Sequence, residues 1–171
     1  GGAVVTECLP QYSGLEERIP FSGVVFYAPL IRPVHWAVNK RLHTLISPFR
    51  DFVARKFSDN SNDPEFAAFI REKDPLQPRY LSSKWVGALK QWIPFAERHT
   101  PVDFPLLIIQ GKSDQTVDWE NNIPHFQRLF PGSDVVYMPN VRHHVVNELE
   151  LYRRDVFART IKYLDTFSTQ A

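Results

Sequence analysis

Two residues that follow apolar runs could together perform acid–base chemistry. Asp114 lies a few residues after the run 104–110, and His143 lies shortly after the run 134–138. In open α/β sheets, catalytic groups gather at the carboxyl ends of the strands, because the loops converge there. A carboxylate bound to one imidazole nitrogen fixes the tautomer of the ring and stabilises the imidazolium that forms during acyl transfer. The pair therefore predicts the acid and the base of an acyl-transfer site.

Neighbouring residues leave alternatives for both roles. A single Asp after a strand often only caps a turn, because its side chain accepts hydrogen bonds from nearby backbone N–H groups. Asp118 could replace Asp114 as the acid, but it lies about one helical turn farther along the chain and is better placed as a helix N-cap. His144 could replace His143 as the base, since only one of two adjacent histidines can point into a site.

The sequence offers no serine in the setting of a nucleophile elbow. The pattern G-x-S-x-G, which exposes a serine on a tight strand-to-helix turn, does not occur in the 171 residues. Ser22 and Ser133 lack the upstream glycine, and Ser113 lacks the downstream one. Cys8, the single cysteine, reads as a small buried apolar residue of a helix rather than as a nucleophile.

The composition argues against several classes of function. Lys and Arg number 20 and Asp and Glu 19, for a net charge of +1, which argues against a nucleic-acid surface. One cysteine cannot form an intrachain disulfide, and no Cys/His cluster has zinc spacing, so we expect neither a metal nor another cofactor. No apolar run approaches the roughly 18 residues of a transmembrane helix.

Three short apolar runs predict buried parallel strands. Residues 23–28, 104–110 and 134–138 are almost unbroken apolar stretches, as expected for strands covered on both faces. Helical spacing predicts a helix over 119–130, with a late start or a kink at Pro124. A stripe of apolar residues predicts a long amphipathic helix over 149–167. Strands alternating with helices indicate the α/β class.

The middle of the chain differs from its two ends. Residues 31–100 hold no strand-like run but many aromatic residues, and they predict two helices, over 36–57 and 84–98. Residues 59–64 form a polar loop between them. A segment of this kind, inserted between two core strands, is most simply a helical cap over one end of the sheet.

These patterns define a domain organisation. We expect an α/β core over 1–30 and 101–171 and a helical cap over 31–100. Three parallel strands with apolar faces leave a bare sheet edge, so we expect an upstream half of the domain to precede Gly1.

The sequence resembles a known family in the segments that carry Asp114 and His143. The segment 104–118 is similar to the acid-bearing segment of monoacylglycerol lipase and lysophospholipase-like α/β-hydrolases, the branch with a serine aminopeptidase-type cap. The segment 142–148 resembles their histidine segment, in which a Glu follows the catalytic His by five residues. That spacing selects His143, with Glu148 as the marker. Residues 73–76 resemble the return from their cap, and 153–164 their terminal helix.

The resemblance extends to the first residues. Residues 1–5 look like the last glycine of the nucleophile elbow and the start of the helix behind it, which places the nucleophilic Ser two positions before Gly1. An appended Gly1–Gly2 pair is the alternative. The resemblance implies the C-terminal part of an α/β-hydrolase sheet and a Ser-Asp-His triad with Asp114 and His143 as acid and base.

The implied activity is hydrolysis of carboxylic esters, with a monoacylglycerol or a lysophospholipid as the expected substrate. A peptide substrate, an inactive hydrolase-derived binding module and a fragment without function of its own are the alternatives. We expect a cytoplasmic or peripheral-membrane location, with any membrane contact made through the cap. Five apolar cap residues could line an acyl pocket or simply pack the cap on the core: Trp36, Leu42, Leu45, Phe49 and Trp85.

Overall fold

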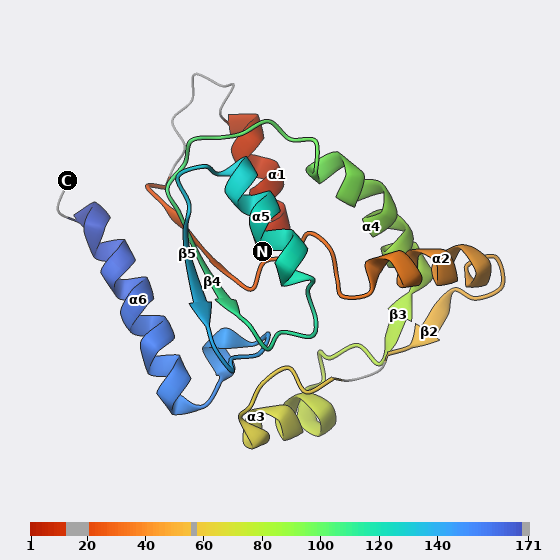
Figure 1. Ribbon diagram of the computed structural model, residues 1–171. Coiled ribbons are helices and arrows are strands. Elements are labelled where there is room, and N and C mark those ends of the chain that lie inside the picture. Colours follow the sequence, from red (N-terminus) through yellow and green to blue (C-terminus); the bar gives the residue numbers. More distant parts are fainter. Residues whose placement is uncertain (13–20, 56–57, 169–171) are drawn as a thin grey trace.

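A three-stranded parallel sheet forms the centre of the fold (Figure 1). The computed structural model describes residues 1–12, 21–55 and 58–168. Strand β4 (Leu106–Gly111) lies between β1 (Val24–Tyr27) and β5 (Asp134–Met138). The register pairs Val24 with Leu106 and Gly111 with Met138. The three predicted strands are therefore present, and the α/β class is confirmed.

Both faces of β4 are covered, which explains why the strand reads as an unbroken apolar run. Leu106 and Ile108 belong to one core cluster, and Leu107 and Ile109 belong to another. The first cluster packs against α1 (Gly2–Tyr12) and α5 (Trp119–Leu129), and the second against α6 (Glu150–Ser168). Figure 1 shows α1 and α5 lying together over the sheet, with α6 on the other side of β5.

Helix α5 begins at Trp119, so the predicted late start is wrong. Pro124 lies inside the helix with its ring exposed, while Ile123 and Phe126 are fully buried on the opposite side. Burial of that apolar side outweighs the roughly 3 kcal/mol that an interior proline costs a helix. Helix α6 matches its predicted span, but of its apolar stripe Val156 is fully buried while Leu164 stays exposed.

The predicted helix 36–57 is wrong in its second half. Helix α2 (Trp36–Ile46) ends two residues before Pro48, which has no N–H to continue the helical hydrogen bonds, although Ser47 itself keeps helical dihedral angles. The chain then forms β2 (Phe52–Ala54), which pairs antiparallel with β3 (Tyr80–Ser82). The expectation that residues 31–100 form no strand is therefore also wrong. The end of the predicted helix, 56–57, lies outside the described residues.

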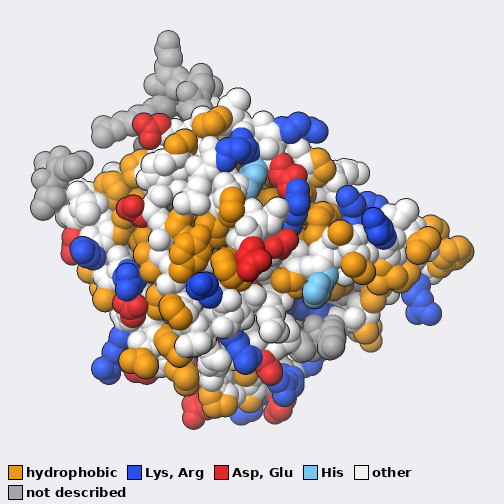
Figure 2. Space-filling model, in the orientation of Figure 1, with side chains coloured by type: hydrophobic (Ala, Val, Ile, Leu, Met, Phe, Trp, Pro, Cys, Tyr) orange, Lys and Arg blue, Asp and Glu red, His pale blue; other side chains and the backbone are white. Residues whose placement is uncertain are grey.

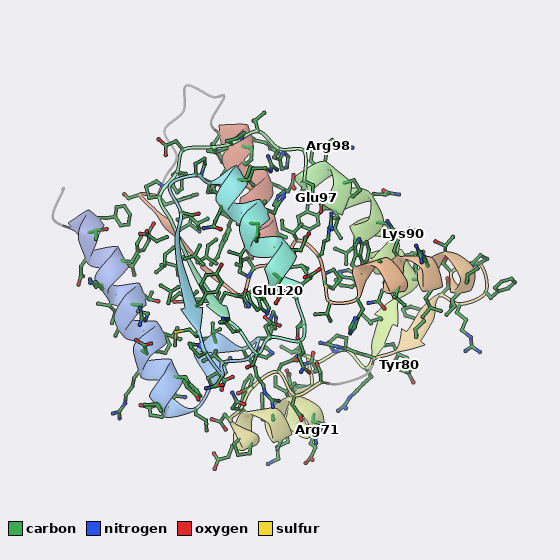
Figure 3. All side chains as sticks on the ribbon, in the orientation of Figure 1. Arg71, Tyr80, Lys90, Glu97, Arg98 and Glu120 are labelled. Atoms are coloured by element: carbon green, nitrogen blue, oxygen red, sulfur yellow. The ribbon has the colours of Figure 1, made fainter. Side chains whose placement is uncertain are left out.

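The remaining elements of the middle segment follow in order. Helix α3 (Pro64–Ala68) continues into the π-helical turn η1 (Phe69–Lys73), and α4 (Ser83–Ala96) fits the second predicted helix. Lys90 on α4, labelled in Figure 3, donates a hydrogen bond of 2.9 Å from its Nζ to Thr44 Oγ1 on α2.

The predicted cap and the predicted core contribute residues to one buried cluster. Leu89 and Ile93 of α4 are buried in the same cluster as Leu9 of α1. The assignment of 31–100 as a separate cap stays a prediction. None of the described helices has the length and apolarity needed to cross a membrane.

Candidate active site

The loop that carries Asp114 (112–118, the acid loop) and the loop that carries His143 (139–148, the histidine loop) are in direct contact at the carboxyl ends of β4 and β5. Ser113 N donates to the carbonyl of Val141 at 2.9 Å, and Lys112 N donates to that of Met138 at 3.0 Å. Gly111 permits this approach, because a Cβ there would lie 2.4 Å from the Val141 carbonyl oxygen and 2.5 Å from that of Arg142. The glycine is therefore required by space rather than by backbone conformation.

Asp114 uses both carboxylate oxygens. Oδ1 accepts hydrogen bonds from the backbone N–H groups of Thr116 (2.7 Å) and Val117 (3.1 Å). Oδ2 accepts from Nδ1 of His143 at 2.9 Å and from Nε2 of Gln110 at 3.2 Å. The side chain is 0% exposed. Oδ1 thus makes the turn-capping contacts, and Oδ2 makes the contact with the predicted base.

Charge is favoured on Asp114 despite its burial. Burial of the carboxyl would raise its pKa, but the hydrogen bond and positive charge of His143 oppose this, as do the N–H groups of Thr116 and Val117. The opposing effects are larger together, and the pKa of Asp114 lies below its ordinary value. The acid is therefore ionised at neutral pH, which is the state that orients an imidazole.

His143 presents its second nitrogen for chemistry. A carboxylate only accepts hydrogen bonds, so Nδ1 carries the proton and Nε2 is the acceptor of the neutral ring. The side chain is 24% exposed. It lines a hollow of about 710 Å³ together with Gly1, Gly2, Thr116 and Trp85. The ring therefore joins a buried acid on one side to an open space on the other.

The two alternative residues take other positions. Asp118 is the N-cap residue of α5, as predicted, although its side chain makes no capping hydrogen bond. His144 donates its backbone N–H to the carbonyl of Asn60 at 2.9 Å and packs edge-on against Phe66. Burial, together with the nearby charge of His143, lowers the pKa of the His144 ring. Of the two histidines, the structure brings His143 to Asp114.

A second hollow, of about 310 Å³, lies between α2, α4 and the β2–β3 pair. Trp36, Leu42 and Trp85, three of the five cap residues singled out in the sequence, line it. Leu45 and Phe49 are not among its lining residues and are 71% and 85% exposed. Trp85 and Pro33 line both hollows, so the second adjoins the space beside His143.

Sequence reasoning missed the residues that hold the histidine loop. Glu148 served only as a marker, yet it is fully buried and binds the backbone N–H of Arg142 at 2.8 Å. The polar loop predicted over 59–64 contacts the same loop through Asn60 and Asn62. The one available signal was the cluster of small polar residues at 58–63, which also occurs in ordinary loops. Among the described residues, no group of three or more His, Cys, Asp or Glu is arranged to hold a metal ion.

Comparisons with known proteins place the chain in a family. Residues 1–150 match the model of the serine aminopeptidase, S33, family. The structure resembles a monoacylglycerol lipase of Paleococcus ferrophilus, with 16% identity and a TM-score of 0.76, over 96% of this chain and 64% of that one.

It also resembles a soluble variant of monoglyceride lipase from Saccharomyces cerevisiae, solved with a substrate analogue, with 19% identity and a TM-score of 0.74. That alignment covers 97% of this chain and 62% of the yeast chain. This chain thus spans less than two thirds of the length of either structure. No curated protein sequence matches it. The chain belongs to the serine aminopeptidase S33 family of α/β-hydrolases.

Proposed function

We propose that this chain supplies the acid and the base of a serine hydrolase that cleaves carboxylic esters. The observation that carries the proposal is the 2.9 Å hydrogen bond from His143 Nδ1 to buried Asp114, beside an open hollow. The family and the folds of the lipase structures support the reaction class. Asp114 is the acid, His143 is the base, and the nucleophilic Ser lies two positions before Gly1 in the full-length protein.

The reaction proceeds through an acyl-enzyme. His143 Nε2 takes the hydroxyl proton as the Ser oxygen attacks the ester carbonyl, and ionised Asp114 stabilises the resulting imidazolium. The imidazolium then gives its proton to the leaving alkoxide, and the alcohol departs. In the second half of the reaction, water attacks the acyl-enzyme while His143 takes its proton. The imidazolium then returns this proton to the Ser oxygen, and the carboxylic acid is released. Gly1 and Gly2 line the same hollow as His143, which is where this scheme requires the nucleophile turn.

The second hollow favours a lipid-type ester as substrate. Its volume of about 310 Å³ lies at the lower end of the range for small-molecule sites. Aliphatic and aromatic side chains dominate its lining, so burial of an alkyl chain is favourable there. Among the described residues that line it there is no Asp or Glu, whereas a peptide substrate of an aminopeptidase needs a carboxylate for its amino terminus. A monoacylglycerol or lysophospholipid therefore fits better than a peptide.

Ester turnover by the full-length protein tests the proposal. We expect hydrolysis of p-nitrophenyl esters with kcat/KM rising from acetyl to medium acyl chains, because each added methylene contributes about 0.8 kcal/mol when buried. His143→Ala should lower kcat by ~10³-fold or more, whereas the matched change His144→Ala should leave most of it. No turnover by the folded wild type, or equal losses in the two variants, would exclude the assignment.

A lipid surface is the proposed partner of the outer end of α2. Leu45 and Phe49 are largely exposed there, and Lys40, Arg41 and Arg50 lie nearby in the chain. Figure 2 shows hydrophobic side chains gathered on the protruding end of the molecule, with basic side chains beside them. Apolar and basic side chains together suit the interface of an anionic bilayer.

A further inference from the structure

Glu148 is a buried carboxylate that the proposed reaction does not use. Oε1 accepts from Arg142 N (2.8 Å) and Asn62 Nδ2 (3.1 Å), and Oε2 accepts from Asn62 N (3.0 Å) and Leu149 N (3.3 Å). Every partner is an N–H donor. A glutamine cannot reproduce this set, because its own NH₂ group would face two donors. Three of the four bonds, those from Arg142 and Asn62, tie the residue before His143 to the segment 58–63.

Asn62 joins the two sides of the histidine loop. Its Nδ2 donates to the carbonyl of Asn140 at 2.7 Å as well as to Glu148. Asn140 has φ of 63°, in the left-handed region that few side chains other than Asn adopt. It makes the turn that leads β5 into the loop carrying His143. Asn62 therefore holds this loop at one point before His143 and at one point after it.

Asn60 connects the same segment to both loops of the site. Its carbonyl accepts from the backbone N–H of His144 at 2.9 Å, and its Oδ1 accepts from Thr116 Oγ1 at 2.9 Å. Thr116 is also the residue whose N–H holds Asp114. Ser61 Oγ adds a bond of 2.6 Å to the carbonyl of Asn147.

We propose that residues 58–63 and Glu148 form a brace that positions His143 against Asp114, with Asn62 and Glu148 as its main positioning residues. The proposal rests on the function proposed above for His143. The brace holds the histidine loop from one side, and the close approach at Gly111 limits it from the other. With both present, the 2.9 Å bond between His143 and Asp114 is kept before any substrate binds.

The test uses two variants of the full-length protein, Asn62→Ala and Glu148→Gln. The first readout is the far-downfield ¹H NMR signal of the His143 Nδ1 proton, assigned by its loss in His143→Ala. We expect this signal to broaden or disappear in both variants, because a loosened loop exposes the proton to exchange with water. The second readout is turnover: kcat should fall roughly 10- to 100-fold, as for displacements of about 1 Å, with KM little changed.

Thr44→Val is the matched control. Thr44 Oγ1 also donates to a backbone carbonyl, that of Lys40 at 3.0 Å, and it belongs to the same middle segment. Its hydrogen bonds, to Lys40 and Lys90, stay within α2 and α4, and it is not among the lining residues of either hollow, so neither the proton signal nor kcat should change. Circular dichroism confirms that each variant is folded. If Asn62→Ala does not fold, the milder change Thr116→Val, which removes only the hydroxyl bond to Asn60, decides in its place.

The outcomes separate the brace from the catalytic assignment. An unchanged proton signal and unchanged kcat in the folded variants would overturn the brace. A lost signal in the variants together with no turnover by the wild type would uphold the brace and overturn the proposed function. Losses of signal and of kcat in the brace variants, but not in Thr44→Val, are the expected result.

Discussion

At the scale of single residues, the two oxygens of Asp114 have separate tasks. Two backbone N–H groups hold Oδ1 and restrict rotation of the carboxylate, and Oδ2 accepts from the imidazole of His143 and from Gln110. Orientation and charge are thus supplied by different contacts of one side chain. This arrangement predicts different results for changes that remove the charge and for changes elsewhere on the same loop.

Asp114→Asn keeps the shape of the side chain but removes its charge. The amide can accept bonds from Thr116 and Val117 only by turning its NH₂ toward His143, which then must present the wrong tautomer. We expect kcat to fall by ~10⁴-fold with little loss of folded protein. Asp118→Asn, a few residues along, should leave kcat within a few-fold. Ester turnover measured beside thermal unfolding of both variants checks this, and equal effects would contradict it.

The half-buried ring of His144 leads us to expect that the protein loses stability in mild acid. Burial, and then the charge of His143, lowers the pKa of His144 in the folded protein. The unfolded chain binds a proton on this side chain near pH 6.5, and the folded chain does so only at lower pH. The free energy of unfolding therefore falls as the pH drops below about 6.5.

The variant His144→Asn should make this fall shallower without abolishing it, because burial also lowers the pKa of His125. Urea unfolding at a series of pH values measures the slope. Thr44→Val provides the control, since it removes no titratable group and should keep the wild-type slope. A wild-type slope in His144→Asn would show that its ring is not buried as described.

At the scale of elements, the contact between β4 and the histidine loop depends on Gly111. Gly111→Ala places a Cβ against two carbonyl oxygens of the backbone, which cannot move as a flexible side chain can. We expect a loss of about 1–3 kcal/mol in the free energy of unfolding, as for other overpacked sites, together with lower kcat.

Gly87→Ala is the opposite case. Gly87 lies inside α4, and the nearest atoms to an added Cβ are those of His43 at 3.8 and 3.9 Å. We expect a gain of roughly 0.5–1 kcal/mol, because alanine is the better helix former. Denaturant unfolding of both variants gives the two signs. The same sign for both would mean that crowding does not decide the effect of Gly111→Ala.

The sequence predicted the elements that show a pattern within one short run of residues. It missed those that depend on contacts between residues far apart in the chain. β4 could be predicted because burial on both faces leaves an unbroken apolar run, and Asp114 and His143 because each follows such a run. β2 and β3 are three residues each and are stabilised by pairing with one another, which short propensity patterns do not reveal. The bonds from Asn62 to Glu148 span 86 residues, so no spacing in the chain indicates them.

At the scale of the whole molecule, charge and apolar exposure are unevenly distributed. The net charge is +1, yet residues 36–55 hold four Lys or Arg residues and a single acidic one, Asp51. The outer end of α2 also exposes Leu45 and Phe49. The hollow of about 310 Å³ is lined by neighbouring residues of the same helix, including Leu42 and Ile46. A lipid leaving a bilayer would therefore have a short apolar path to it.

The variant Leu45→Asp/Phe49→Asp should lose binding to anionic vesicles. We expect the wild type to sediment with vesicles of phosphatidylglycerol and phosphatidylcholine more than with phosphatidylcholine alone, and less at high salt, because salt screens the basic side chains. Leu151→Asp is the control, since Leu151 is 77% exposed and belongs to α6, which Figure 1 shows on the opposite side of the sheet from α2. Equal binding by all three proteins would contradict the proposed surface.

Labelling of the full-length protein by a fluorophosphonate, with the modified residue located by mass spectrometry, tests the central claim most directly. Such a reagent reacts with a serine only when an adjacent base activates it. We predict one rapid adduct, on the Ser two positions before Gly1, with labelling much slower in His143→Ala and nearly unchanged in His144→Ala. No adduct on folded protein, or an adduct whose rate does not depend on His143, would contradict the assignment of Asp114 and His143 as acid and base.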